Sequence, residues 1–369
     1  MKLRYKIANG FLIVLAVAIG SLAFVVSRDD PCPPASESVV DANSETMKAV
    51  VYRCYGPPDV LKLEDVERPV PGDDELLVKI HAASVNPLDW HYMRGSPYIM
   101  RLGSGLGAPD DTSMGVDFAG TVEAVGSSVT QFKPGDRVFG GRGGAFAEYL
   151  TIPQDRALAL MPENISFDQA AAVPIAAITA LQALRDKGKV QPGQKVLING
   201  ASGGVGTFAV QIAKALGAEV TGVCSTRNVE LVRSIGADHV VDYKKEDYTD
   251  AGKQYDLIID MVGNHSPLEN TRVLTPEGIL VMVGGPKGNW FGPLVPPVKA
   301  AVTSPFVDQE LALILARMNK DDLIFLAELM QAGQVTPVID KRYSLSDVPA
   351  AMAYSESGRA RGKIIINVD

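Results

Sequence analysis

Short apolar runs separated by glycine and proline fill two parts of the chain, one up to about Leu160 and one near its end. In the first part, MKAVVYRCYG (residues 47–56) and Glu75–Val85 predict strands. In the second, KIIINVD (residues 363–369) predicts a strand that pairs back onto the first part. This pattern is typical of an irregular, β-barrel-like domain whose two portions are far apart in sequence.

The pattern changes near Pro162. The stretch Ala170–Leu184 is rich in alanine and leucine and predicts a helix, with a kink or break at Pro174. From Lys195 to about Lys320, fully apolar strands alternate with helices, which indicates a parallel sheet covered on both faces. We therefore predict an α/β fold with a doubly wound parallel sheet in residues 163–334 and a β-rich domain in residues 47–162 and 335–369.

The first residues differ from all others, because Ile7–Val26 contains no charged side chain and Lys2, Arg4 and Lys6 precede it. At about 1.5 Å per residue this run spans roughly 30 Å, the thickness of the hydrocarbon core of a bilayer. It is also longer than the apolar core of a secretory signal, which has about 7–15 residues. We interpret residues 1–26 as an N-terminal transmembrane helix, a single-pass anchor that makes the membrane a partner. A cleaved secretory signal is the alternative.

Composition narrows the class of protein. Residues 27–46 are rich in serine, proline and acidic residues and predict a flexible linker. The formal net charge of −8 argues against nucleic acid as a partner. Cys32, Cys54 and Cys224 are too few and too scattered for a disulfide framework or a zinc cage, so we expect a reduced, intracellular type of protein.

A glycine-rich turn is the first candidate for chemistry. Lys195–Asn199 predicts a strand, Gly200–Gly206 follows at once, and Val205, Ala209 and Ile212 then recur on one face of a helix. Glycines permit a tight turn and a close approach of the backbone to a pyrophosphate, and the helix N-terminus presents free N–H groups to it. In this setting the turn predicts a dinucleotide-binding site. A purely structural glycine-rich loop is the alternative.

The end of the next strand bears on the choice of dinucleotide. NAD-binding proteins usually carry an acidic residue there, about 20 residues beyond the turn, for the ribose hydroxyls. Val223–Asn228 contains no acid but includes Ser225, Thr226 and Arg227. Because hydroxyls and a guanidinium suit a 2′-phosphate, we predict NADPH as the cofactor.

Five further motifs belong together: ASVNPLD (residues 83–89), GVDFAG (115–120), ASGGVG (201–206), GAD (236–238) and GRARGK (358–363). With them, residues 47–369 resemble the zinc-independent quinone oxidoreductase branch of the medium-chain dehydrogenase/reductase superfamily. The resemblance implies a GroES-like catalytic domain in residues 47–162 and 335–369, a Rossmann domain in residues 163–334, and an active site between them.

The resemblance also implies roles for single residues. Asn86 is expected near the nicotinamide, and His91 and Tyr92 are candidate proton donors, with Tyr98 or water as alternatives. His91 is the first choice because it follows Asp89 in the loop expected at the active site, although a packing histidine is an equally simple interpretation. The implied cofactor-binding residues are Ala201, Ser202, Gly203, Gly204, Val205, Ser225, Arg227, Tyr243, Gly284, Arg359 and Arg361.

Metal chemistry is not expected. Zinc-dependent relatives carry cysteine where Asn86 stands, a His-Glu pair where Val116-Asp117 stands, and a lobe with four cysteines, and none of these is present. Without a Lewis acid, hydride transfer favours a carbon that conjugation has already made electron-poor. We expect an NADPH-dependent, zinc-independent oxidoreductase that acts on quinones or α,β-unsaturated carbonyls.

Two other functions stay open: a zinc-type alcohol dehydrogenase with an unforeseen metal site, and a non-enzymatic, membrane-tethered NADPH-binding sensor or scaffold. A homodimer is expected from families of this kind. The membrane side is ambiguous, because the cationic start at Lys2, Arg4 and Lys6 places the enzyme across the membrane while NADPH is a cytoplasmic cofactor. We prefer the cytoplasmic face.

Overall fold

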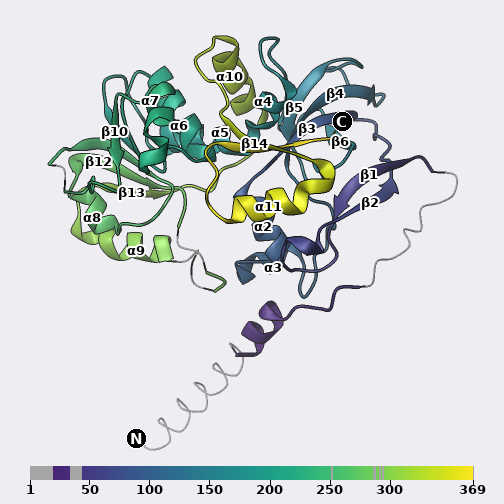
Figure 1. Cartoon of the computed structure of the whole chain (residues 1–369), viewed down its shortest axis with the longest axis horizontal. Helices are drawn as coiled ribbons and strands as arrows, with labels where there is room; N and C mark the ends of the chain where they lie inside the picture. Colours follow the sequence, from purple (N-terminus) through teal and green to yellow (C-terminus); the bar gives the residue numbers. More distant parts are fainter. Residues whose placement is uncertain are drawn as a thin grey trace, which may run out of the picture.

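The computed structural model describes residues 20–33, 44–250, 252–285, 288–290, 292 and 295–368. Two large sheets build it, one in each of two lobes that lie side by side (Figure 1). The strands of one sheet are parallel, and the other sheet is largely antiparallel. The chain enters the parallel-sheet lobe after β7 (Leu158–Leu160) and leaves it before β14 (Ile339–Ser344).

The parallel sheet has six strands in the order β10-β9-β8-β11-β12-β13. Strand order reverses between β8 and β11, and ligands bind such sheets at the carboxyl ends of the strands beside this point. Val196 and Ile198 of β8 pack in one hydrophobic cluster and Leu197 packs in another, so the predicted sheet with two covered faces is confirmed. The strands are β8 (Lys195–Asn199), β9 (Glu219–Cys224), β10 (His239–Asp242), β11 (Tyr255–Asp260), β12 (Leu274–Met282) and β13 (Glu310–Leu313).

Helices cover both faces of this sheet. The predicted break at Pro174 is confirmed, because one helix ends at Ala171 and the next begins at Pro174, where the missing N–H costs no hydrogen bond. Between the two sheets in sequence, α4 (Phe167–Ala171) packs on the largely antiparallel sheet. The helices of the parallel-sheet lobe are α5 (Pro174–Gln182), α6 (Gly204–Ala215), α7 (Val229–Ser234), α8 (Pro267–Thr271), α9 (Val295–Thr303) and α10 (Lys320–Gln331).

The β-rich lobe contains a seven-stranded sheet in the order β14-β15-β3-β4-β5-β7, with β6 also paired to β3. The predicted return is confirmed, because β15 lies antiparallel to β3. A separate hairpin joins β1 (Thr46–Val51) to β2 (Lys62–Glu67). The other elements are β3 (Glu75–Val85), α2 (Pro87–Arg94), α3 (Arg101–Ser104), β4 (Asp117–Val125), β5 (Arg137–Gly141), β6 (Tyr149–Pro153), α11 (Val348–Glu356) and β15 (Lys363–Asn367).

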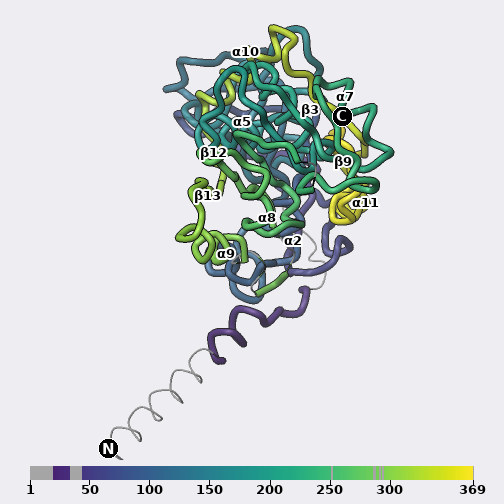
Figure 2. The backbone as a smooth tube through the Cα atoms, turned by 90° about the vertical axis from the view of Figure 1, so that its left-hand side faces the viewer, coloured from purple at the N-terminus to yellow at the C-terminus, as the bar shows by residue number. Residues whose placement is uncertain are grey.

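Most of the predicted anchor, residues 1–26, lies outside the described residues. Its end is described, and residues 20–27 form a helix that projects from the β-rich lobe (Figures 1 and 2). Throughout the described part of the chain, every helix is too short or too polar to cross a bilayer.

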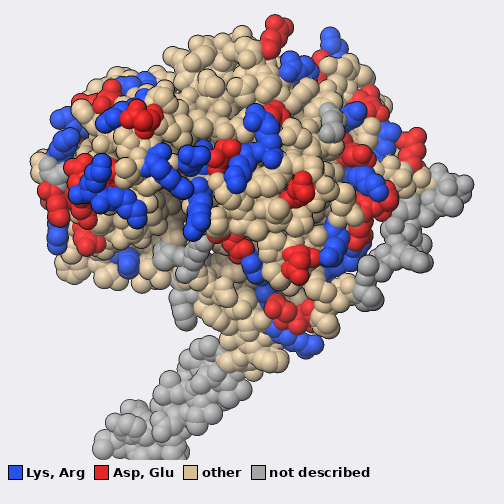
Figure 3. All heavy atoms as spheres, in the orientation of Figure 1, with Lys and Arg blue, Asp and Glu red and all other residues tan. Residues whose placement is uncertain are grey.

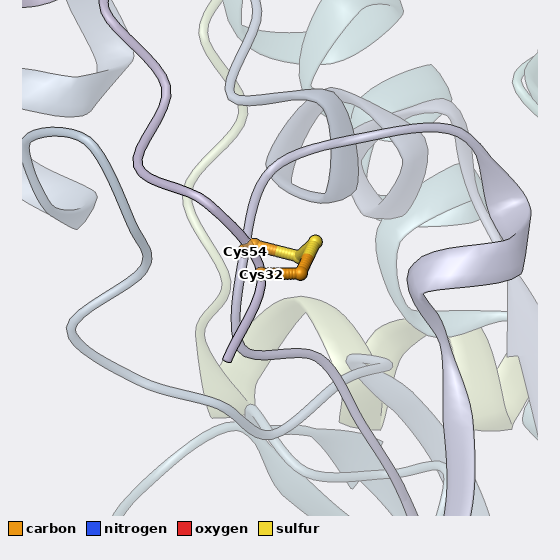
Figure 4. Close-up of a disulfide and its surroundings, with 2 residues drawn as sticks. All are labelled: Cys32 and Cys54. Carbon is orange, nitrogen blue, oxygen red and sulfur yellow. A yellow bond between two sulfur atoms is a disulfide. The ribbon is translucent and has the colours of Figure 1, made fainter. Parts of the chain in front are cut away.

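The predicted flexible linker is wrong for its first residues, because residues 27–33 are held on the β-rich lobe. The Asp30 N–H donates to the carbonyl of Gly107 at 2.9 Å. Cys32 forms a disulfide with Cys54, with a Cα–Cα distance of 5.0 Å (Figure 4). The expectation of reduced cysteines is therefore also wrong. Spacing in sequence does not show where the chain returns, and only the fold brings these two thiols together.

Candidate functional site

The glycine-rich turn opens α6 at the carboxyl end of β8. Gly200 has a φ of +92°, and its N–H and that of Ala201 both donate to the carbonyl of Val223. A Cβ at Gly206 would lie 2.1 Å from the carbonyl oxygen of Gly200, so only glycine permits this closeness of helix and turn. Ser202, Gly203, Gly204 and Val205 are partly exposed around the helix N-terminus, while Ala201 is buried beneath it.

A second group of predicted residues meets at the ends of β9 and β10. Arg227 donates to the carbonyl of Arg359 at 3.2 Å, and the Tyr243 N–H donates to the carbonyl of Cys224, beside Ser225. The ammonium of Lys244 lies 5.1 Å from the centre of the Tyr243 ring. Figure 3 shows that lysine and arginine side chains gather on this face over the boundary of the two lobes. The group can hold an anion.

An acidic residue does lie nearby, which the sequence analysis missed. Asp242 ends β10, opposite Cys224 of β9. Its carboxylate accepts from the N–H of Lys244 at 3.1 Å, and a hydrogen bond from the Thr226 side chain holds its pKa below the usual value. The other carboxylate oxygen, Oδ2, is buried without a hydrogen-bond partner and lies 3.5 Å from the Lys245 ammonium.

Polar side chains also organise the sheet edge between β8 and β11. The Asn199 amide donates to Asp260 at 2.9 Å and to Asn264 at 2.7 Å, and Asp260 in turn accepts from the N–H groups of Val262 and Gly263. Gly284 follows β12 at this edge, where a Cβ would lie 2.3 Å from the carbonyl oxygen of Met261. Only glycine at position 284 permits this closeness of the chain after β12 to the Met261 backbone.

Arg361, which was also predicted to bind the cofactor, contacts Asp340 rather than Arg227 or Tyr243. Its N–H donates to Asp340 at 3.0 Å, and its guanidinium lies 3.7 Å from the same carboxylate. Tyr354 donates to Asp340 as well. Of the two predicted arginines, Arg359 contacts Arg227 and Arg361 is held away.

A buried polar cluster (Ser84, Asn86, Asp117 and Lys363) lies in the β-rich lobe. The Asn86 amide donates to Asp117 at 2.9 Å and its oxygen accepts from the ammonium of Lys363. Ser84 donates to Asp117 at 3.1 Å, and the Lys363 ammonium lies 3.4 Å from the same carboxylate. All four are almost fully buried. Both ends of the Asn86 amide are therefore engaged, which fixes its orientation.

The charges of the cluster are poorly solvated. Burial raises the pKa of Asp117 and lowers that of Lys363, while the attraction between them opposes both shifts. Asp89, one turn into α2, accepts from the N–H of Asn86 at 2.7 Å. Burial raises the pKa of Asp89 to about 7. Its carboxyl group therefore changes charge near neutral pH.

The cluster and the glycine-rich turn are adjacent although they belong to different lobes. A Cβ built on Gly204, in the first turn of α6, would lie 3.4 Å from the Lys363 Cδ. Lys363 was predicted only as the end of a motif, and Ser84 and Asp117 were not predicted to be its polar partners. The lone lysine at the start of an otherwise apolar strand could have indicated a buried charge there.

The two candidate proton donors lie on α2. His91 Nδ1 is 2.6 Å from the carbonyl oxygen of Ser96, and its ring stacks on Trp90 with centroids 3.7 Å apart. Because a carbonyl only accepts, Nδ1 carries hydrogen and proton exchange is left to Nε2. Tyr92 is partly buried on the same helix, near Tyr52, whose pKa is raised mainly by burial and least by Tyr92.

No group of three or more histidine, cysteine, aspartate or glutamate side chains in the described chain could hold a metal ion. Asn86 and Asp117, which stand at sequence positions where zinc-dependent relatives were expected to carry ligands, contact the Lys363 ammonium.

Comparisons with known proteins agree with this architecture. Residues 72–163 match the alcohol dehydrogenase GroES-like domain, and residues 235–366 match a family described as zinc-binding dehydrogenase. The chain is 34% identical to a 2-methylene-furan-3-one reductase of Solanum lycopersicum, over 93% of this chain and 84% of that protein.

Two solved structures are similar in fold. The quinone oxidoreductase from Coxiella burnetii has a TM-score of 0.78 and 31% identity, over 88% of this chain and all of that one. The Escherichia coli quinone oxidoreductase complexed with NADPH has a TM-score of 0.74 and 26% identity, over 87% of this chain and 100% of that one. The chain is thus an NAD(P)H-dependent oxidoreductase of the medium-chain dehydrogenase/reductase superfamily, in its quinone oxidoreductase-like branch.

Proposed function

We propose that this protein uses NADPH to reduce quinones or α,β-unsaturated carbonyls without zinc. The observation that carries the proposal is the contact between the glycine-rich turn at Gly204 and the polar cluster at Lys363. It puts a helix N-terminus suited to a pyrophosphate beside a buried, oriented amide and an ammonium group. The names of the tomato reductase and of the two quinone oxidoreductases support the same acceptor classes.

The choice of NADPH rests on Arg227, Tyr243 and Lys244. A 2′-phosphate carries negative charge, and these residues offer a guanidinium, an exposed aromatic ring and an ammonium at one edge of the sheet. Asp242 ends β10 and not β9, the strand that usually carries the acid for the ribose hydroxyls in NAD-binding proteins. The Escherichia coli structure complexed with NADPH supports this choice.

The cofactor, when bound, supplies a hydride. Asn86 then orients the reacting groups, since Asp117 and Lys363 hold both ends of its amide. The Lys363 ammonium stabilises the negative charge that develops on the acceptor oxygen. His91 in its doubly protonated form would deliver the proton from Nε2 and become neutral, while its Nδ1 hydrogen stays bonded to the Ser96 carbonyl; Tyr92 is the alternative donor.

The direct test is steady-state oxidation of NADPH and NADH by the purified full chain. Benzoquinone, an open-chain enone and a saturated aldehyde serve as acceptors, each with and without a metal chelator. We expect turnover with the first two acceptors, NADPH preferred, and no effect of chelation. Activity lost on chelation would favour a zinc-type alcohol dehydrogenase. Tight NADPH binding without turnover of any acceptor would favour a sensor or scaffold.

The N-terminal run Ile7–Val26 would tether the enzyme to a membrane. The Cys32–Cys54 disulfide favours an oxidising compartment for the catalytic lobes, and so does the cationic start of the chain under the positive-inside rule. Only the supply of NADPH favours the cytoplasmic face. A reporter fused to the C-terminus, active on one side of a membrane only, decides between the two.

A homodimer is the proposed assembly. In the described chain, β13 has a neighbour strand on one side, and Phe306, Leu313 and Leu315 expose apolar side chains near this edge. Pairing of β13 with its copy would cover such an edge. Light scattering of the purified protein in detergent measures the mass that this predicts.

A further inference from the structure

Exposed apolar side chains gather where the N-terminal helix meets the β-rich lobe. Leu22, Phe24 and Val25 lie on the helix of residues 20–27, and Ile99, Leu102 and Leu106 lie on or beside α3. Each of these six side chains, here called the apolar face, is 47–66% exposed. The N-terminal helix lies close to α3 in Figure 1, and Arg101 of α3 donates to the carbonyl of Val26.

Arg101 joins the two halves of this face rigidly. It is 2% exposed, and its guanidinium donates to the carbonyls of Val26 and Arg28 and to the Asp29 carboxylate, at 2.8–3.2 Å. The rings of Tyr55 and Tyr98 enclose it, with centroids at 4.4 and 4.6 Å. Separating a buried guanidinium from this many partners costs free energy, so residues 26–29 stay attached to the β-rich lobe.

Two further bonds hold the segment in place. The Asp30 N–H donates to the Gly107 carbonyl, and the disulfide ties Cys32 to Cys54. The position and tilt of the helix are therefore set by the catalytic lobe. If residues 7–26 enter an apolar environment, the apolar face must therefore contact the same environment.

We propose that this face lies against a lipid bilayer. The run Ile7–Val26 has no charged side chain, and its end is the helix that carries Leu22, Phe24 and Val25. Charges return at once in Arg28, Asp29 and Asp30, which suits the level of the lipid headgroups. A second copy of this chain is the competing occupant, but it would not explain the length of the apolar run.

The face adjoins the proposed active site. Ser96, whose carbonyl binds His91, lies three residues before Ile99, and its hydroxyl donates to Asn289 of the other lobe at 2.7 Å. The backbone carbonyl of Asn289 accepts a hydrogen bond from the Tyr98 N–H. The rings of Trp290 and Tyr98 meet edge to face, with centroids 4.8 Å apart. A lipid-soluble acceptor leaving the bilayer here would arrive beside α2. This last step rests on the proposed function.

Hydrogen exchange on the full chain tests the contact without using activity. The protein is compared in detergent and in vesicles of phosphatidylcholine with phosphatidylglycerol. We expect exchange of the backbone amides of residues 99–106 to slow several-fold in vesicles, while those of β6 (Tyr149–Pro153) do not change. Unchanged exchange at residues 99–106 overturns the proposal. So does protection that follows protein concentration in detergent, which indicates a second copy.

Paired variants then separate lipid contact from folding and from catalysis. Ile99→Glu/Leu102→Glu should remove the protection of residues 99–106 in vesicles, and Val70→Glu, an exposed site elsewhere, should not. With the double variant, kcat/KM for a long-chain quinone in vesicles should fall several-fold, while that for soluble benzoquinone stays the same. Loss of both activities with altered circular dichroism is misfolding, and Leu106→Glu then replaces the double variant. If neither quinone is reduced by the parent protein, the proposed function fails, and the exchange result still decides the contact.

Discussion

Lys363 is 3% exposed, and the acidic residue that accepts a hydrogen bond from its ammonium is Asp117. Removal of one member of a buried ion pair leaves the other charge uncompensated, which costs about 3–5 kcal/mol. We expect Lys363→Met to lower the free energy of unfolding by that amount in chemical denaturation. The double variant with Asp117→Asn should recover much of the loss, because both members of this ion pair are then uncharged. Equal losses in the two variants would contradict this account.

Asp89 gives stability a pH dependence. Burial raises its pKa from 3.8 to about 7, so the folded protein binds this proton more tightly than the unfolded chain. The resulting contribution is complete below pH 3.8 and is lost as the pH rises through about 7. Asp89→Asn keeps an acceptor for the Asn86 N–H and has no proton to lose. The difference in unfolding free energy between parent and variant should change across this range; a constant difference would show that Asp89 is not shifted.

Arg227 belongs to the proposed 2′-phosphate site. We expect Arg227→Gln to raise KM for NADPH about tenfold, equivalent to about 1.4 kcal/mol, with little change in KM for NADH. The effect should shrink at high salt because this side chain is exposed. Arg233→Gln is the matched control, since Arg233 pairs with Glu230 at the surface of the following helix. Equal effects on both cofactors would place Arg227 outside the 2′-phosphate site.

Among the elements, the turn from β8 to α6 leaves little room for a larger residue at one of its glycines. A Cβ at Gly206 would lie 2.1 Å from the Gly200 carbonyl oxygen, whereas one at Gly203 would have its nearest neighbour at 3.4 Å. Overpacking of this kind typically costs about 1–3 kcal/mol. Gly206→Ala should therefore unfold at lower denaturant concentration than the parent protein and bind NADPH more weakly. Gly203→Ala should unfold at the parent's midpoint.

Sequence periodicity predicted the elements well where burial alone decides the pattern. The strand Glu75–Val85, the break at Pro174 and the alternation from β8 onward follow from local rules. The hydrogen-bond partners of Asn86 do not follow from local rules, because Asp117 and Lys363 reach Asn86 only when β3, β4 and β15 pair. The pairing of strands that are far apart in sequence cannot be predicted from residue spacing, so the buried ammonium of Lys363 was not predicted. Asp242 was not predicted because an acidic residue was expected only at the end of β9.

At the scale of the whole molecule, the disulfide joins the N-terminal segment to the catalytic lobe. Of the three cysteines, only Cys224 is free, and burial raises its pKa to about 11. Thiol titration of the unfolded protein should find one thiol before reduction and three after it. Loss of the cross-link should lower stability by about 2–4 kcal/mol, to be measured for Cys32→Ser/Cys54→Ser by denaturation. Three thiols in unreduced protein would show that the bond does not form.

The interruption of the β-rich sheet has a consequence for synthesis. A ribosome makes β3 and β4 early, but β15 only after the entire parallel-sheet lobe has been made. Until then, Ala82–Val85 of β3 lack their β15 partner, and Asn86 and Asp117 lack the ammonium of Lys363. A nascent chain therefore carries an incomplete polar cluster until β15 has been made, and under the proposed function such a chain would not yet reduce its acceptor.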